Sequence, residues 1–279
     1  MLSFKEIRRE FEPELVGINA FRSMVKEYLQ CKILAYIFQS SFKHRLIFIG
    51  GTKLRLLNNF RRFSEDLDFD IIGDYSSDDH LSLCNMLINE LEKHNIKAEL
   101  DQDKKISEID VQTRYINFPG IMEKAGFKDV PNRKFFIKLD AQKHDFGPYS
   151  YQSEIRILNH FDVFAPVHCA PDSMILSTKL CSILERNKGR DYYDIVELVK
   201  TTRPDISYIA NRLEHGKFKL KYTGSSSYIK LYLEAIKHVD WDDKVREIEK
   251  FLFNQDEAIK VKMFASFVTE DKIKEWLTT

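Results

Sequence analysis

The stretch from Phe48 to Ile71, FIGGTKLRLLNNFRRFSEDLDFDI, contains residues whose types and spacing could carry out chemistry together. In DLDFDI, Asp66, Asp68 and Asp70 alternate with apolar residues, so in a β-strand all three carboxylates would project from one face. Like charges at neighbouring positions repel one another and contribute nothing to a core. A bound cation would remove this conflict, and Asp66 and Asp68 offer the oxygen ligands that Mg²⁺ prefers.

A Gly50-Gly51-Thr52 turn precedes these acids. Glycines let the backbone approach phosphate oxygens closely, and the N–H groups at the start of a helix bind anions. A strand, this turn, a helix and an Asp-x-Asp strand could therefore hold a nucleoside triphosphate against metal ions. Two such ions would stabilise the attacking and leaving oxygens of an in-line displacement.

A third carboxylate is expected from a neighbouring strand. In KFFIKLDAQK (134–143), the alternation places Asp140 on the face opposite the apolar residues. Asp140 could be an acid at the end of a surface strand, but its combination with DLDFDI favours a role as a metal ligand.

The periodicity of apolar residues predicts the elements that position these groups. The first part of the chain is predicted to contain helices at 15–40, from near Thr52 and at 77–94, with strands at 45–49, 66–71, 96–101, 110–118, 134–142 and 154–157. After Pro171 the predicted elements are all helices, at 172–186, 191–201, 205–213, 226–238, 242–253 and 270–277. We therefore predict an α+β fold, with a mixed sheet flanked by helices in residues 1–165 and a helical bundle in residues 166–279.

The charge of the chain is balanced overall but uneven locally. Its 279 residues contain 43 Lys and Arg and 43 Asp and Glu, which excludes a global basic field of the kind found in many nucleic-acid-binding proteins. No acidic residue occurs between Tyr28 and Ser64, where seven residues are basic: Lys32, Lys43, Arg45, Lys53, Arg55, Arg61 and Arg62. This block could bind a negatively charged partner beside the metal, or it could form solvated helix faces. We predict RNA contacts for Lys53, Arg55, Arg61 and Arg62, with Lys217, Lys219 and Lys221 as a second basic group.

Cysteine usage and hydropathy favour a cytoplasmic location. The four cysteines show no paired spacing, and the N-terminal MLSFKEIRRE does not resemble a signal peptide, so reduced, buried thiols are expected. No apolar run approaches the roughly 20 residues needed to span a membrane. The histidines lack zinc-ligand spacing, and the P-loop motif GxxxxGK[ST] is absent, which argues against a Walker-type NTPase.

Four segments together, GGTKLRLL, RRFSEDLDFD, LSTKLCSILER and GRDYYDIVEL, resemble the AbiEii/AbiGii toxin family. These proteins are nucleotidyltransferases of the DNA polymerase beta superfamily, include the MenT toxins and act in type IV toxin–antitoxin and abortive-infection systems. The resemblance extends in patches from Leu46 to about Val199. It implies that Gly50, Gly51 and Thr52 form the phosphate-binding turn and that Asp66 and Asp68 bind metal, with Asp140 as a looser match. It also implies that Lys179 contacts the triphosphate. The RD-x-x-D element at the nucleotide would consist of Arg190, Asp191 and Asp194.

The residues in the second half also allow simpler interpretations. Lys179 could be a surface lysine whose stem lies along an apolar helix, although the resemblance favours a ligand. Asp191 could cap a helix, and Arg190 could form an ion pair with Asp194. An equally strong alternative is that these residues orient Lys179 or the nucleotide.

The sequence therefore predicts transfer of a nucleoside monophosphate from an NTP, dependent on Mg²⁺ or Mn²⁺. Asp140 would act as a base or as a third metal ligand, and Lys179 would neutralise the triphosphate. The resemblance implies an RNA acceptor, a tRNA 3′ end, together with a genetically linked antitoxin that acts without stable binding and no membrane partner. The alternatives are transfer to a small molecule, a metal-dependent nuclease and an inactive nucleotide-binding scaffold. The Gly-Gly-Thr turn argues against the nuclease, and the intact set of acids argues against the scaffold.

Overall fold

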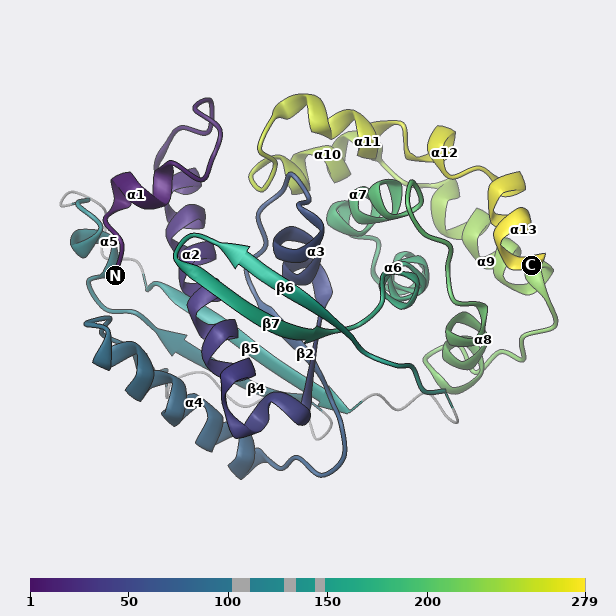
Figure 1. The fold of residues 1–279 in the computed structure, drawn as a ribbon. Coiled ribbons are helices and arrows are strands. Elements are labelled where there is room, and N and C mark those ends of the chain that lie inside the picture. The colour runs from purple at the N-terminus through teal and green to yellow at the C-terminus, as the bar shows by residue number, and fades with distance from the viewer. Residues whose placement is uncertain (102–110, 128–133, 144–148, 279) are drawn as a thin grey trace. The chain divides into compact units, whose positions relative to one another are not determined.

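The computed structural model describes residues 1–101, 111–127, 134–143 and 149–278. The chain divides into two compact units, Met1–His144 with Ser153–Cys169 (unit 1) and Asp145–Gln152 with Ala170–Thr279 (unit 2). Unit 1 contains the sheet and unit 2 is built from helices (Figure 1). The predicted α+β class is therefore confirmed. The predicted division between residues 165 and 166 falls inside a strand of unit 1.

Unit 1 is organised around a seven-stranded mixed sheet in the order β3-β4-β5-β2-β1-β7-β6. Strands β2 and β5 are parallel, as are β1 and β7, and the other neighbours are antiparallel. The strands are β1 (Leu46–Ile49), β2 (Leu67–Ile71), β3 (Glu99–Leu100), β4 (Val111–Asn117), β5 (Phe136–Lys143), β6 (Glu154–His160) and β7 (Val163–Cys169). Asp110, the first residue of one predicted strand, lies outside the described residues.

Helices pack against this sheet because contact with it removes their apolar faces from water. Helices α2 and α4 pack against each other, α2 also against β7 and α4 against β4, while α3 contacts β1, β2 and β6. A capping box between Ser76 and Asp79 starts α4, as the SSDD sequence predicts. The helical elements of unit 1 are α1 (Phe4–Arg8), α2 (Ile18–Gln39), η1 (Ser41–His44), α3 (Gly50–Asn58), α4 (Ser77–Lys93) and α5 (Ile121–Lys124).

Unit 2 forms a separate core in which α6 packs against α7, α8 and α9. Its interior is rich in aromatic residues, including Tyr192, Tyr228, Tyr232 and Phe264. The elements are α6 (Asp172–Arg186), α7 (Gly189–Leu198), α8 (Ile206–His215), α9 (Ser225–Lys237), α10 (Trp241–Glu249), η2 (Gln255–Ala258), α11 (Ile259–Lys262), α12 (Phe264–Phe267) and α13 (Glu270–Thr278). None of the described helices is long and apolar enough to cross a membrane.

Strand β7 is absent from the sequence prediction, and Pro166 explains why. A proline lacks the N–H that a strand between two neighbours needs, so it normally argues against a central strand. In the structure, β7 pairs with β6 along its whole length, whereas its register with β1 is limited to Phe48 and Cys169. Pro166 is therefore tolerated, because the part of β7 in which it lies pairs with β6 and not with β1.

Candidate active site

Two predicted metal ligands are neighbours across the centre of the sheet. In the parallel pair of β2 and β5, Asp68 is the register partner of Asp140, and Leu67 is the partner of Leu139. Leu67 and Leu139 are fully buried, whereas both aspartates are half-buried on the other face. Asp66 directly precedes β2. The alternation predicted from DLDFDI and KFFIKLDAQK thus brings carboxylates from distant segments to one place.

The glycine turn closes against the same carboxylates. Gly50 begins α3 with a φ of +80°, and a β carbon on it would lie 2.3 Å from Oδ2 of Asp68. A β carbon on Gly51 would lie 2.7 Å from Nη2 of Arg62 and 3.0 Å from Oγ of Ser64. Gly50 is therefore specified both by its positive φ and by the Asp68 carboxylate, whereas a β carbon at Gly51 would displace the Arg62 guanidinium.

Thr52 and Asp66 tie the start of α3 to the start of β2. Thr52 is fully buried, and its hydroxyl donates a hydrogen bond to the backbone carbonyl of Asp66. Its side chain therefore positions the segment and is not presented to solvent. Burial raises the pKa of the Asp66 carboxyl, an effect that the ammonium of Lys138 opposes and the charges of Glu65 and Asp140 reinforce.

Both carboxylate oxygens of Asp140 have partners within unit 1. Thr113 Oγ1 on β4 donates to Oδ1 at 2.7 Å, and Lys138 Nζ forms an ion pair with Oδ2. Burial alone would lower the pKa of Lys138, but the hydrogen bond and charge of Asp140 more than offset this and raise it. Lys138 is a site residue that the sequence analysis missed, although its position two residues before Asp140 on the same face could have indicated it.

The donor set of this site suits a hard divalent cation shared with a substrate. Among the residues that the structure describes, no three His, Cys, Asp or Glu side chains are grouped so that they could hold a metal ion. Mg²⁺, however, is usually held by one or two carboxylates together with waters and substrate phosphates, not by an all-protein cage. Asp66, Asp68 and Asp140 supply such carboxylates beside a glycine turn, so these residues fit Mg²⁺ that arrives with a nucleotide.

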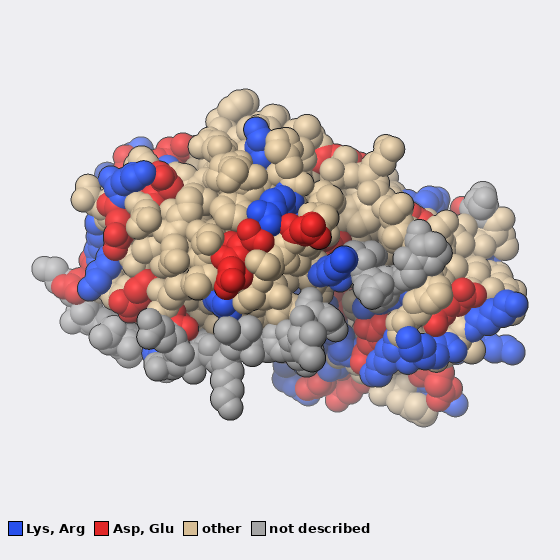
Figure 2. Space-filling model, turned by 90° about the horizontal axis from the view of Figure 1, so that it is seen from below, with Lys and Arg blue, Asp and Glu red and all other residues tan. Residues whose placement is uncertain are grey.

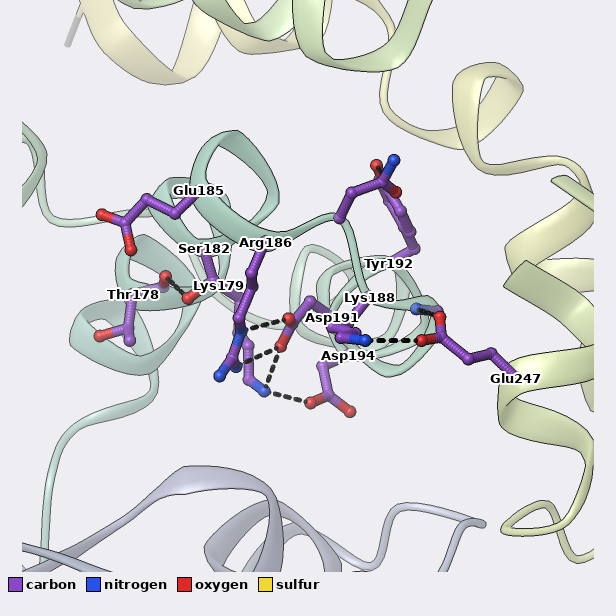
Figure 3. A network of polar contacts seen from close by, with 12 residues as sticks. Thr178, Lys179, Ser182, Glu185, Arg186, Lys188, Asp191, Tyr192, Asp194 and Glu247 are labelled. Carbon is purple, nitrogen blue, oxygen red and sulfur yellow. Dashed lines mark hydrogen bonds and ion pairs between the residues drawn. The ribbon is translucent and has the colours of Figure 1, made fainter. Parts of the chain in front are cut away.

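Lys179 lies at the centre of an ion-pair network inside unit 2 (Figure 3). Its Nζ is 2.8 Å from Oδ1 of Asp191 and 2.8 Å from Oδ2 of Asp194. Arg186 also binds Asp191, with Nε 2.9 Å from Oδ2 and Nη2 3.0 Å from Oδ1. Burial would raise the pKa of Asp191, but the charges of Lys179 and Arg186 hold it well below its usual range.

This network excludes two of the simpler interpretations of the second half. Lys179 is only 5% exposed, so its interpretation as a surface lysine is wrong. Helix α7 begins at Gly189 with Lys188 as its N-cap, so Asp191 lies within the first turn and does not cap the helix. Asp191 and Asp194 instead form ion pairs with the ammonium of Lys179. Arg190 is half-buried on the same helix.

Three of the four predicted RNA contacts lie in the interior of unit 1. Lys53 is fully buried and donates to Oδ1 of Asn58 at 3.1 Å. Arg55 is 8% exposed and forms two 2.9 Å hydrogen bonds to the buried Glu27. Arg62 is 2% exposed beside Gly51. The assignment of these three side chains to RNA is therefore wrong for this structure, because none of them reaches the surface.

The remaining members of the basic block are largely neutralised by acids from elsewhere in the chain. Arg61 is exposed but pairs with Glu12 at 2.8 Å. Two further ion pairs have the same effect, Lys32 with Asp162 and Arg45 with Asp79. On the face shown in Figure 2, basic and acidic side chains lie in small interspersed groups.

A seven-stranded mixed sheet that presents Asp-x-Asp beside a third acid, with a glycine turn against it, has the architecture of a nucleotidyltransferase. The family described as "Nucleotidyl transferase AbiEii toxin, Type IV TA system" matches residues 32–276. The chain therefore belongs to the AbiEii family of nucleotidyltransferase toxins from type IV toxin–antitoxin systems.

Solved structures are similar to this chain at low sequence identity. MenT4, a nucleotidyltransferase toxin of Mycobacterium tuberculosis H37Rv, is 15% identical with a TM-score of 0.64, and the match covers 99% of this chain and 93% of MenT4. JHP933 of Helicobacter pylori is 18% identical with a TM-score of 0.49, covering 91% of this chain and 92% of its own. The structure of a "putative nucleotidyltransferase from H. pylori" has the same identity and TM-score, and the match covers 91% of this chain and 95% of its own. No curated protein sequence matches the chain.

Proposed function

We propose that the chain is a metal-dependent toxin that transfers a nucleoside monophosphate from an NTP to RNA, with the 3′ end of a tRNA as acceptor. The metal is Mg²⁺, with Mn²⁺ as the alternative. The observation that carries this proposal is the pairing of Asp68 with Asp140 next to the backbone of Gly50. Membership of the AbiEii family supports the reaction class, and the RNA acceptor follows from the resemblance alone.

The residues of unit 1 have distinct roles in this proposal. The backbone N–H groups of Gly50 and Gly51 are assigned to the phosphates, because they lie at the start of a helix and glycine carries no β carbon of its own. Asp66, Asp68 and Asp140 provide the oxygens that hold the metal. Bound metal would neutralise the charge that develops on the attacking and leaving oxygens. As the alternative to metal binding, Asp140 is assigned as the base that accepts the proton of the acceptor hydroxyl while that oxygen attacks the α-phosphate and pyrophosphate leaves.

In unit 2 we assign the triphosphate to Lys179. Its ammonium is held by Asp191 and Asp194 at 2.8 Å each, which fixes the direction of a long side chain that would otherwise rotate. Arg190 belongs to the same RD-x-x-D element and is assigned to the nucleotide with them. As a toxin of a type IV system, the chain would act in the cytoplasm beside a genetically linked antitoxin that does not bind it stably.

Incubation of the purified protein with each labelled NTP, Mg²⁺ and total RNA tests this proposal. Label on RNA of tRNA length is the expected result, and digestion from the 3′ end should release it first. Shortened RNA would indicate a nuclease, and label on a small molecule would indicate a different acceptor. No reaction with any NTP, in a protein that remains folded, would contradict the proposal. The Asp68→Asn variant is the control for contaminating activity.

A further inference from the structure

Lys138 forms an ion pair with one predicted metal ligand, Asp140, and its charge also acts on a second, Asp66. It precedes Asp140 by two residues on β5, so both side chains project from the same face of the sheet. Its Nζ forms an ion pair with Oδ2 of Asp140, while Oδ1 accepts from Thr113 at 2.7 Å. The Lys138 side chain is 28% exposed and that of Asp140 is 17% exposed, so water screens this pair only partly.

These contacts limit the ability of Asp140 to bind a metal ion unless its partners move. Both of its oxygens already accept from a donor. A divalent cation beside Oδ2 would lie next to the ammonium, and two cations so close repel each other.

We propose that Lys138 is the resident counter-ion of this carboxylate cluster. Its ammonium must leave Asp140 before that carboxylate can bind a metal ion, and the phosphates of the arriving nucleotide then accept the displaced ammonium. Metal binding and nucleotide binding are therefore coupled: the free protein binds metal weakly, and the nucleotide strengthens that binding. This inference rests on the proposed function, because it assigns the acids to a metal shared with an NTP.

Binding of Mn²⁺ tests the inference without any turnover. Free Mn²⁺ is measured by electron paramagnetic resonance during titration of the protein, with and without a non-hydrolysable NTP analogue. Lys138→Met and Lys138→Gln should bind Mn²⁺ alone about tenfold more tightly than the wild type, because a like charge close to the site is gone. In both variants the analogue should increase Mn²⁺ affinity much less than it does in the wild type.

Two variants separate this role from a general effect of charge or folding. Lys143→Gln removes an exposed lysine from the end of the same strand, and it should leave Mn²⁺ affinity unchanged. Lys138→Arg retains the positive charge and should keep the weak affinity of the wild type. Lys138→Gln can still donate a hydrogen bond to Asp140, so it provides a folded variant if Lys138→Met does not fold, as judged by circular dichroism.

The outcomes distinguish the inference from the function on which it rests. Unchanged Mn²⁺ affinity in folded Lys138→Gln, while the wild type binds Mn²⁺ together with the analogue, would overturn the role of Lys138 and leave the proposed function standing. A wild type that binds no Mn²⁺ even with the analogue would contradict the proposed function itself. Tighter binding of Mn²⁺ alone in the Met and Gln variants, but not in the Arg variant, would support the inference.

Discussion

Asp68 on β2 and Asp140 on β5 are register partners in two parallel strands at the centre of the sheet. Their carboxylates are therefore held by the hydrogen-bonded ladder and by the buried leucines on the opposite face, Leu67 and Leu139. Sites built on strands keep their geometry better than sites built on loops. The catalytic proposal can consequently be tested by substitutions that change one carboxylate and leave its supporting strand intact.

Replacement of Asp68 by asparagine should abolish nucleotide transfer without destabilising the protein. The amide cannot supply the negative oxygen that a metal ion needs, and removal of one charge relieves the repulsion among Asp66, Asp68 and Asp140. We expect activity to fall at least about a thousandfold, as when an essential transition-state contact is lost, with an unchanged or slightly raised Tm. Transfer of labelled NMP and thermal denaturation measure the two effects. Full activity in folded Asp68→Asn would remove this residue from the site.

Gly50→Ala should disable the site through the side chain of Asp68. The new β carbon would lie 2.3 Å from Oδ2, so the carboxylate must move, and the φ of +80° would add strain of about 1–2 kcal/mol. Gly73 is a matched control, since its φ is +68° and a β carbon there meets nothing within 4 Å. Both alanine variants should lose similar stability in urea unfolding, but activity should fall in Gly50→Ala alone. Equal activity in the two variants would contradict the close approach of the Asp68 carboxylate to Gly50.

The sequence predicted the acids of the site because strand alternation is a local property. DLDFDI and KFFIKLDAQK each showed which side chains share a face, and the observed burial follows that pattern in Phe136–Ala141 and in Leu67–Phe69. Asp70 departs from it, because this carboxylate is only 2% exposed. The register between the two strands could not be predicted, because nothing within either segment specifies its partner. Lys138 was missed because strand alternation shows that it shares a face with Asp140 but not that the two side chains form an ion pair.

Long-range pairing also explains the error in the basic block. The absence of acids between Tyr28 and Ser64 describes only neighbours along the sequence. Whether a basic side chain is neutralised depends on which acids lie near it in the folded structure. Arg55 is paired with Glu27, Arg61 with Glu12 and Lys32 with Asp162. A buried arginine requires such a partner, because an unpaired charge inside a protein is very costly. Charge runs in a sequence therefore indicate a binding surface only when the fold leaves them exposed.

Lys179→Ala should impair both stability and the use of NTP. The substitution leaves Asp194 and Asp191 in a buried setting without their shared ammonium, which typically costs about 3–5 kcal/mol. If Lys179 also contacts the triphosphate, kcat/KM for NTP should fall more than about tenfold. The double variant Lys179→Ala/Asp194→Asn separates the two effects, since it removes one of the two buried negative charges that Lys179 neutralises. It should regain stability in urea unfolding but not activity, and recovery of activity would show that Lys179 is structural.

The stabilisation provided by Asp191 should disappear in acid. Because Lys179 and Arg186 lower the pKa of this carboxyl in the folded protein, its contribution is complete above the unfolded pKa of about 3.9. It is lost as the pH falls below that value toward the depressed folded pKa. The gap in unfolding free energy between the wild type and Asp191→Asn should therefore be constant from pH 7 to 5 and shrink below about pH 4. Urea titrations at each pH measure it, and a gap that persists unchanged at pH 3 would contradict the ion-pair account.

With three of the predicted RNA contacts buried, Lys217, Lys219 and Lys221 become the basic group to test. All three are exposed in the segment between α8 and α9, and Lys219 donates to the carbonyl of His215 at 2.7 Å. If they contact three phosphates of a tRNA 3′ end, replacing all three by glutamine should weaken RNA binding. It should also reduce the slope of log affinity against log salt by about 2, at about 0.7 per phosphate of a single strand.

Arg61→Gln is the control for this test, because Arg61 is exposed but already paired with Glu12. It should leave both the affinity for RNA and the salt slope unchanged. Fluorescence anisotropy of a labelled tRNA at several salt concentrations measures both quantities, and NTP affinity should be unaffected in either variant. If the triple variant kept the salt slope of the wild type while Arg61→Gln reduced it, the RNA contact would lie in unit 1, contrary to this prediction.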